Sequence, residues 1–250
     1  MTRIIGVLNY KGGTAKTTTV VNLAAGLAMR GARVLCIDLD AQGGLATYLG
    51  VRYTYSVTHL LLGQASPEAC VFRARDNLDI IASDRNLLRV EGELWQLADR
   101  WKARQRLAEK VGSLTGYDYI FFDFSPSVSL LGESGLLCVK ELIVPVTMGY
   151  LALVGTRQVI ETLKSIGHVP NHTLSLSYVV PTYYRGQRRK DREIIEMLRR
   201  YFGDRVTSPI RENVKLSEAP GHSQTIYEYA PRSSAANDYS RLVERVANDA

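Results

Sequence analysis

Short, uninterrupted runs of apolar residues recur along this chain, and several of them end in a glycine-rich or acidic turn. Apolar runs without polar alternation are typical of strands that are buried on both faces of a parallel sheet. They predict strands over residues 4–8, 34–37, 78–82, 119–122, 142–146, 174–180 and 206–210.

Apolar residues at helical spacing fill most of the stretches between these runs. They predict helices over residues 17–29, 85–111, 130–139, 157–166 and 191–201, and an amphipathic helix around residues 239–246. Trp95 and Trp101 are expected to face the core or an interface. Strand–helix–strand units of this length place consecutive strands in parallel. We therefore expect one doubly wound α/β domain over residues 1–250, with a mostly parallel sheet and helices on both faces.

The composition is that of an ordinary soluble protein, with 46% hydrophobic and 22% charged residues. No apolar run reaches the roughly 18 residues that a membrane-spanning helix needs. The first residues lead straight into a strand, so neither a signal peptide nor an N-terminal helix-turn-helix is expected. The three cysteines are scattered and odd in number, which favours free thiols in a reducing cytoplasm.

Basic residues are concentrated in one stretch of the chain. Residues 185–205 hold eight lysines and arginines against four acidic residues, and so carry four of the chain's six net positive charges. A charge run of this kind is usually a solvated helix face, but contact with a polyanion requires the same clustering. The stretch is therefore a candidate surface for nucleic acid.

The segment KGGTAKTT, residues 11–18, separates the first predicted strand from the first predicted helix. A phosphate-binding loop has that placement and the pattern G-x-x-x-x-G-K-[ST]. Lys16 and Thr17 match the end of the pattern, whereas glycines stand at positions 12 and 13 rather than 10 and 15. We expect the loop backbone and the helix N-terminus to hold phosphate, with Lys16 on the β- and γ-phosphates and the Thr17 hydroxyl on Mg²⁺.

Acidic residues follow two of the predicted strands. Asp38 and Asp40 come at the end of the second strand, and Asp123 directly follows the run at 119–122, as in a Walker B strand. In a parallel sheet these carboxylates emerge at the same edge as the loop. An acid at that position can hold Mg²⁺ or orient an attacking water molecule.

The pattern K-G-G-x-x-K-[ST] is the deviant Walker A motif, and the chain resembles the ParA family of partition ATPases in its short, Soj-like form. The similarity covers nearly the whole chain. A late segment, ENVKLSEAPGHSQTIYEYAPRSSAANDYSRL at residues 212–242, separates ParA-like chains from other P-loop ATPases. The other matching positions are the D-x-D-x-Q motif at 38–42, Asp123 and the V-P-V motif at 144–146.

The resemblance implies a P-loop ATPase that forms a dimer around ATP and Mg²⁺, with weak intrinsic turnover. Lys11 would cross the dimer interface to the partner's ATP and stabilise charge on the transferring phosphoryl group, as an arginine finger does. By position, the catalytic residues would be Lys11, Lys16 and Asp40, and the metal site would comprise Thr17, Asp40 and Asp123. The residues implied to contact the nucleotide are Lys11, Gly12, Gly13, Thr14, Ala15, Lys16, Thr17 and Thr18 in the loop and Pro181 and Ile210 near adenine.

The resemblance also implies the cellular role. The ATP-bound dimer would bind double-stranded DNA without sequence specificity and would segregate or position plasmid DNA, chromosomal DNA or another cargo. A ParB-like or other adaptor would stimulate its ATPase, in the cytoplasm over the nucleoid and without a membrane. The candidate DNA contacts are Arg185, Arg188, Arg189, Lys190 and Lys215.

Three positions depart from the family pattern. Ala15 replaces a glycine that commonly has positive φ, where a Cβ atom costs about 1 kcal/mol, so we expect ATP binding with slow turnover. Ser125 replaces the first proline of D-x-P-P and is expected to loosen the turn after the Walker B strand. Glu212 stands where relatives have arginine, which predicts the loss of one DNA contact.

Other functions stay open at this point. A MinD-like membrane ATPase needs a basic amphipathic C-terminal helix, and the tail SRLVERVANDA is short and near-neutral. An ATP-gated DNA-binding scaffold with negligible hydrolysis is suggested by Ala15. A reductase like the nitrogenase iron protein shares the loop but needs bridging cysteines, whereas Cys36 and Cys138 lie within apolar runs.

Overall fold

The computed structural model describes residues 2–96, 99–149, 152–169 and 172–249. Its centre is one seven-stranded sheet with the strand order β3-β4-β2-β5-β1-β6-β7. All pairs are parallel except β3 with β4, so the predicted mostly parallel α/β fold is confirmed. The strands are β1 (Arg3–Val7), β2 (Val34–Leu39), β3 (Val71–Arg75), β4 (Leu78–Ile81), β5 (Tyr119–Phe124), β6 (Glu141–Thr147) and β7 (Ser175–Thr182).

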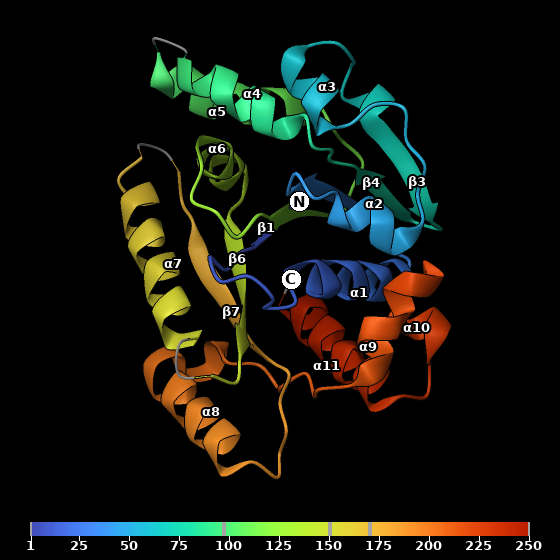
Figure 1. Ribbon diagram of the computed structural model, residues 1–250, viewed down its shortest axis with the longest axis vertical. Helices are drawn as coiled ribbons and strands as arrows, with labels where there is room; N and C mark the ends of the chain where they lie inside the picture. The colour runs from blue at the N-terminus through green and yellow to red at the C-terminus, as the bar shows by residue number, and fades with distance from the viewer. Residues whose placement is uncertain (1, 97–98, 150–151, 170–171, 250) are drawn as a thin grey trace.

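Helices cover both faces of the sheet (Figure 1). The set comprising α1, α2, α10 and α11 packs on one face, and the set from α3 to α8 covers the other. The bounds are α1 Lys16–Ala28, α2 Gly44–Leu49, α3 Val57–Leu62, α4 Leu87–Gln96, α5 Arg100–Val111, α6 Leu130–Cys138, α7 Ala152–Ile166, α8 Arg189–Phe202, α9 Val214–Glu218, α10 Ile226–Tyr229 and α11 Ser234–Asn248.

Two hydrophobic cores explain why the strands are continuously apolar. In β2, Leu35 and Ile37 belong to the core under the α3–α8 layer, while Val34 and Cys36 face the core under α1 and α11. Successive strand residues point to opposite faces, so a strand that is buried on both sides is apolar along most of its length. The polar exceptions in β2 and β5 are Asp38 and Asp123, near the carboxyl ends of these strands. In the described part of the chain, no helix is long and apolar enough to cross a bilayer.

The long helical stretch predicted over residues 85–111 is helical in the structure but comprises two helices, α4 and α5. The Asp99 side chain accepts hydrogen bonds from the backbone N–H groups of Trp101 (3.0 Å) and Lys102 (3.1 Å) and so caps the start of α5. Trp95 and Trp101 are 48% and 42% exposed, so neither is a core residue. The other alternative, that they face an interface, stays a prediction.

The strand predicted over residues 206–210 is wrong. This segment lies beside β7 and donates two backbone hydrogen bonds to it, from Thr207 N to Val179 O (3.0 Å) and from Ile210 N to Pro181 O (2.8 Å). Pro209 has no N–H group to extend such a ladder. Every other predicted strand is present, and β3 is an edge strand that the prediction lacked.

Candidate nucleotide-binding site

The loop between β1 and α1 has the backbone shape of an anion cradle. Gly13 and Ala15 have positive φ angles of 70° and 68°. No side chain caps the start of α1, so the N–H groups of its first turn remain available to a ligand. A Cβ atom built on Gly12 or Gly13 would meet no atom within 4 Å, which leaves open space beside the loop.

Ala15 adopts the left-handed conformation that its position predicts for glycine. The methyl group therefore leaves the shape of the loop intact, at a strain cost of about 1 kcal/mol.

Asn9, which sequence reasoning missed, fastens this loop to the sheet. Its buried side chain donates to the Pro145 carbonyl on β6 (2.8 Å) and accepts from the Lys11 backbone N–H (2.9 Å). The Thr182 hydroxyl, at the end of β7, donates to the Thr14 carbonyl (3.2 Å). The loop is thereby held against two strands before any ligand binds.

The predicted acidic residues meet where β2 and β5 end side by side. Asp38 pairs in register with Asp123, and both carboxylates are buried. Asp38 is fully used by the backbone, because its two oxygens accept from the N–H groups of Asp40 (2.9 Å) and Leu45 (3.0 Å). Burial and the nearby charge of Asp123 raise the pKa of Asp38 well above its ordinary value. Asp38 therefore shapes the turn after β2.

Asp123 has a different environment. Its Oδ2 accepts a hydrogen bond from the Thr17 hydroxyl (2.6 Å), while its buried Oδ1 has no partner among the described residues. Burial raises the pKa of Asp123 to about 7, although the Thr17 bond and the Lys16 charge oppose the shift. A carboxylate oxygen without a partner beside a hydroxyl is a donor set that suits Mg²⁺.

Lys16 begins α1 and is only 8% exposed. Burial lowers the pKa of Lys16, and the charges of Asp123 and Asp40 partly oppose this shift. In the described residues Lys16 has no ion-pair partner, so its ammonium group lacks the anion that a buried cation requires. Asp40 lies nearby and is half-buried, with Oδ1 accepting from the Gln42 N–H (3.0 Å).

A cavity of about 390 Å³ opens beside Ala15 and Thr18 at the start of α1. Ile210 lines it as predicted, but Pro181 does not, and Thr182 and Tyr183 stand in its place. The Pro181 carbonyl is instead used in the backbone bond to the 206–210 segment. Further lining residues that sequence reasoning missed are Asn213, Val214, Leu216, Ser217, Pro220 and Tyr239.

The wall formed by residues 210–213 is fixed by an ion pair with α11. Arg211 donates from its backbone N–H (3.0 Å) and Nε (2.8 Å) to Asp238 Oδ2, and from Nη2 to Oδ1 (2.7 Å). Asp238 is buried and also lies on the helix that packs against α1. The wall of the cavity and the phosphate loop are thus held by the same pair of helices.

Comparison with known proteins gives this site its family. A family model described as an AAA domain matches residues 2–176. The chromosome-partitioning ATPase Soj of Thermus thermophilus is 37% identical over 98% of this chain and 95% of its own length. This chain belongs to the ParA/Soj family of ATPases.

Solved structures of similar fold contain nucleotide. Cobyrinic acid a,c-diamide synthase of Mycobacterium smegmatis, bound to an ATP analogue and magnesium, is 27% identical with a TM-score of 0.84, over 99% of this chain and 95% of that one. The septum site-determining protein MinD of Pyrococcus horikoshii, complexed with Mg-ADP, is 27% identical with a TM-score of 0.83, over 98% and 96% of the two chains.

The five basic residues proposed for DNA contact in this ParA/Soj chain have different surroundings. Arg189 pairs with Glu193 (2.8 Å) and Lys215 with Glu218 (2.9 Å), each within its own helix. Arg185 pairs with an acid from a distant segment, Glu212. Arg188 and Lys190 make no ion pair among the described residues.

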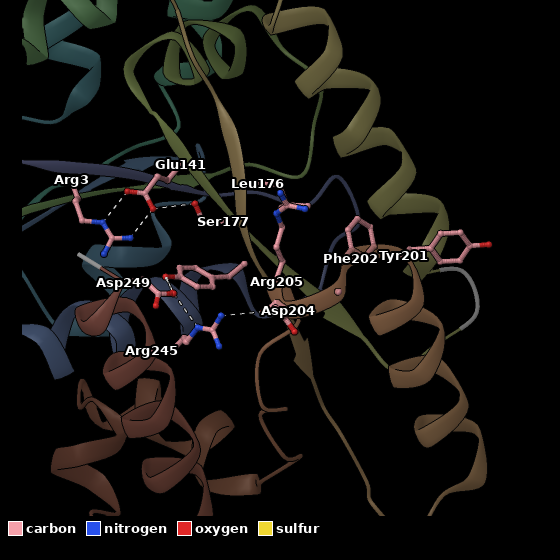
Figure 2. Close-up of a pocket in the computed structure, with 12 residues that line it drawn as sticks. Arg3, Glu141, Leu176, Ser177, Tyr201, Phe202, Asp204, Arg205, Arg245 and Asp249 are labelled. Atoms are coloured by element: carbon pink, nitrogen blue, oxygen red, sulfur yellow. Dashed lines mark hydrogen bonds and ion pairs between the residues drawn. The ribbon is translucent and has the colours of Figure 1, made fainter.

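The largest cavity described in this ParA/Soj chain, about 670 Å³, lies at the opposite edge of the sheet from the loop. Figure 2 shows that Arg3 faces Glu141 and that Arg245 faces Asp249, whereas no interaction is drawn for Arg205. Arg3 donates from Nε (2.9 Å) and Nη2 (2.7 Å) to the two oxygens of Glu141, and Asp249 accepts from Tyr178 (2.7 Å) and Arg245 (3.0 Å). These bonds fasten the end of α11 to the sheet and compensate the charges of both pairs within the protein.

Proposed function

We propose that this protein is a partition ATPase that dimerises on ATP, binds double-stranded DNA without sequence specificity, and positions DNA or another cargo over the nucleoid. ATPase activity and the use of ATP with Mg²⁺ belong to its family. The proposal is carried by two lysines of one loop. Lys16 is buried without a counter-ion among the described residues and lies near the unpartnered Asp123 oxygen, while the second lysine, Lys11, is only half-buried.

The nucleotide chemistry is assigned to residues of one edge of the sheet. N–H groups of residues 12–18 hold the phosphates, and Lys16 neutralises them. Thr17 and Asp123 would hold Mg²⁺, which would offset negative charge on the phosphates. Asp40 orients the attacking water, and the cavity bounded by Thr182 and Ile210 takes adenine.

Dimer formation is assigned to Lys11. Its backbone is fixed by Asn9, but its side chain is only half-buried and has no ion pair in the described part of the chain. A cation held in this way is available to the nucleotide of a second copy. The arrangement would tie ATP binding to association, and a ParB-like or other adaptor would act on the resulting dimer.

DNA binding is assigned to the surface around the start of α8. Phosphate contact needs only clustered positive charge, and the pairs of Arg189 and Lys215 are exposed and therefore weak. Arg188 adds an exposed cation without an ion pair among the described residues.

The DNA assignment is tested by reversing charge at Arg188 and Arg189 together. We expect the double glutamate variant to lose retention of random-sequence duplex DNA while binding ATPγS like the parent protein. The matched control reverses Lys102 and Lys110 on α5, which leaves the surface around α8 unchanged. If retention survives the first change, or is lost equally in the control, the assigned surface is wrong.

A membrane-associated role like that of MinD finds less support. The apolar residues of α11, among them Tyr239, Leu242 and Val246, are buried against the rest of the fold. Their face is therefore not available to lipid, and we expect no co-sedimentation with anionic vesicles in the presence of ATP. The scaffold alternative is excluded if phosphate is released with DNA and adaptor present. We expect this release, because Ala15 keeps the left-handed backbone conformation that glycine has at this position.

A further inference from the structure

One ion pair near the cavity joins two distant parts of the chain. Arg185 follows β7, and Glu212 precedes α9, 27 positions later. The guanidinium donates from Nε and from Nη2 to the two carboxylate oxygens of Glu212, which makes the contact bidentate. Both side chains are partly exposed, at 45% and 37%, so solvent and ions can reach the pair.

The backbone fixes both ends of this pair. Tyr184 N donates to Ile210 O (3.1 Å), and Glu212 N donates to Tyr184 O (3.0 Å). The Arg185 N–H is held by the Asp191 carboxylate (2.8 Å) at the start of α8. Because these bonds hold the two segments at a set spacing, the side chains pair with less loss of conformational freedom than ordinary surface residues.

The pair removes Arg185 from the surface where it is expected to act. A guanidinium binds carboxylate and phosphate with the same fork of N–H donors, so Glu212 and a DNA phosphate compete for one group. The hydrogen bond from Arg185 lowers the pKa of Glu212, which keeps the competing carboxylate charged. Arg188 nearby makes no ion pair in the described residues, although its charge also helps to lower the pKa of Glu212.

We infer that Glu212 is an internal competitor of the DNA backbone for Arg185, and that it weakens nonspecific DNA binding by the whole protein. The inference rests on the proposed binding of duplex DNA. If Glu212 did not compete for Arg185, its only effect on DNA binding would be the absence of the arginine that relatives carry at this position. If it does compete, the Glu212 carboxylate also neutralises Arg185. The carboxylate then loses its own counter-ion whenever a DNA phosphate binds Arg185 instead.

The test measures binding of random-sequence duplex DNA at saturating ATPγS and about 0.15 M salt, where charges beyond about 8 Å are screened. Glu212→Gln is expected to tighten DNA binding about two- to fivefold. The dependence of log K on log salt should steepen by about 0.9, because the freed guanidinium adds one phosphate contact. ATPγS affinity is measured separately, since Glu212 borders the cavity assigned to adenine.

Glu196→Gln on α8 is the matched control, because it removes the same charge from the neighbouring helix and Glu196 has no ion pair among the described residues. We expect its effect on DNA affinity to be much smaller. The decisive comparison repeats Glu212→Gln in an Arg185→Gln background, where the gain should fall to the small gain of Glu196→Gln.

Two results would overturn the inference: an equal gain from Glu196→Gln, or an undiminished gain from Glu212→Gln without Arg185. If neither the parent protein nor Glu212→Gln retains DNA while both bind ATPγS, the proposed DNA-binding function itself fails. Retention by Glu212→Gln alone would support both.

Discussion

Asp123 illustrates how a single buried acid links stability to the metal site. Its folded pKa, raised to about 7, exceeds the ordinary value of 3.8, so the folded protein binds this proton more tightly than the unfolded chain. The fold therefore loses stability as the pH rises from about 4 to about 7. Asp123→Asn removes the buried charge that forms above this pH. Without nucleotide or Mg²⁺, we therefore expect it to raise the melting temperature at pH 8 by several degrees, since each kcal/mol of unfolding free energy shifts the melting temperature by roughly 2–4 °C.

Fluorimetric melts across pH check this prediction. The advantage of Asp123→Asn should shrink as the pH falls toward 4. Glu141→Gln is the control with the opposite sign, because burial is outweighed by the Arg3 hydrogen bonds and the pKa of Glu141 is lowered. That variant should be less stable at pH 8, with the difference shrinking in acid. A lower melting temperature for Asp123→Asn at pH 8 would show that the buried Asp123 carboxylate does not destabilise the fold.

Single residues were predictable where one position decides the local geometry. The positive φ at Ala15 follows from its place before the loop lysine, and the meeting of Asp38 with Asp123 follows from parallel strands that end together. Partners across long stretches of chain were not predictable. Arg185 and Glu212 are 27 positions apart, and only the folded backbone brings them together.

At the scale of elements, the contact between α11 and the 210–213 segment sets the cavity wall. We expect Asp238→Ala to lower the free energy of unfolding by about 1–3 kcal/mol, because it removes the buried acceptor of three hydrogen bonds from Arg211. ATPγS affinity should also fall as the wall loosens. Thermal melts and calorimetric titration measure the two effects.

Glu244→Ala on the same helix is the control. Its ion pair with Arg30 (3.2 Å) is exposed, so its loss should change stability by less than about 0.5 kcal/mol and leave nucleotide affinity unchanged. If both variants behave alike, α11 does not set the cavity wall through Asp238.

Helices and strands were not predicted where polar residues interrupt the apolar pattern on which the prediction depends. Asp99 starts a second helix within a stretch whose apolar pattern is helical throughout. Its carboxylate accepts hydrogen bonds from the first backbone N–H groups of α5, which have no partner within that helix. β3 carries arginines at positions 73 and 75 and so lacks the apolar run that marks the inner strands. At 206–210 the reverse holds, since the segment lies beside β7 and forms only one isolated bridge to it, between Val206 and Val179, rather than a strand of the sheet.

At the scale of the whole molecule, association should depend on one side chain. We expect Lys11→Ala to bind ATPγS within about tenfold of the parent affinity but to remain a single copy, because the cation that reaches the second nucleotide is gone. Light scattering after size exclusion, with and without ATPγS, measures this.

Lys16→Ala is the control for this experiment, since it should lose nucleotide binding itself. A Lys11→Ala protein that dimerises with ATPγS as readily as the parent would show that Lys11 does not join the two copies.

The two edges (rims) of the sheet, at β3 and β7, are built in a way that limits aggregation of the protein. β3 is short, irregular in register between positions 73 and 75 and carries arginines, while the 206–210 segment shields the free side of β7. Unprotected strand rims are templates for fibre growth. With both rims blunted, copies of the protein are directed away from irreversible cross-strand aggregation. The ends of the strands stay free for the reversible, nucleotide-controlled contact proposed above.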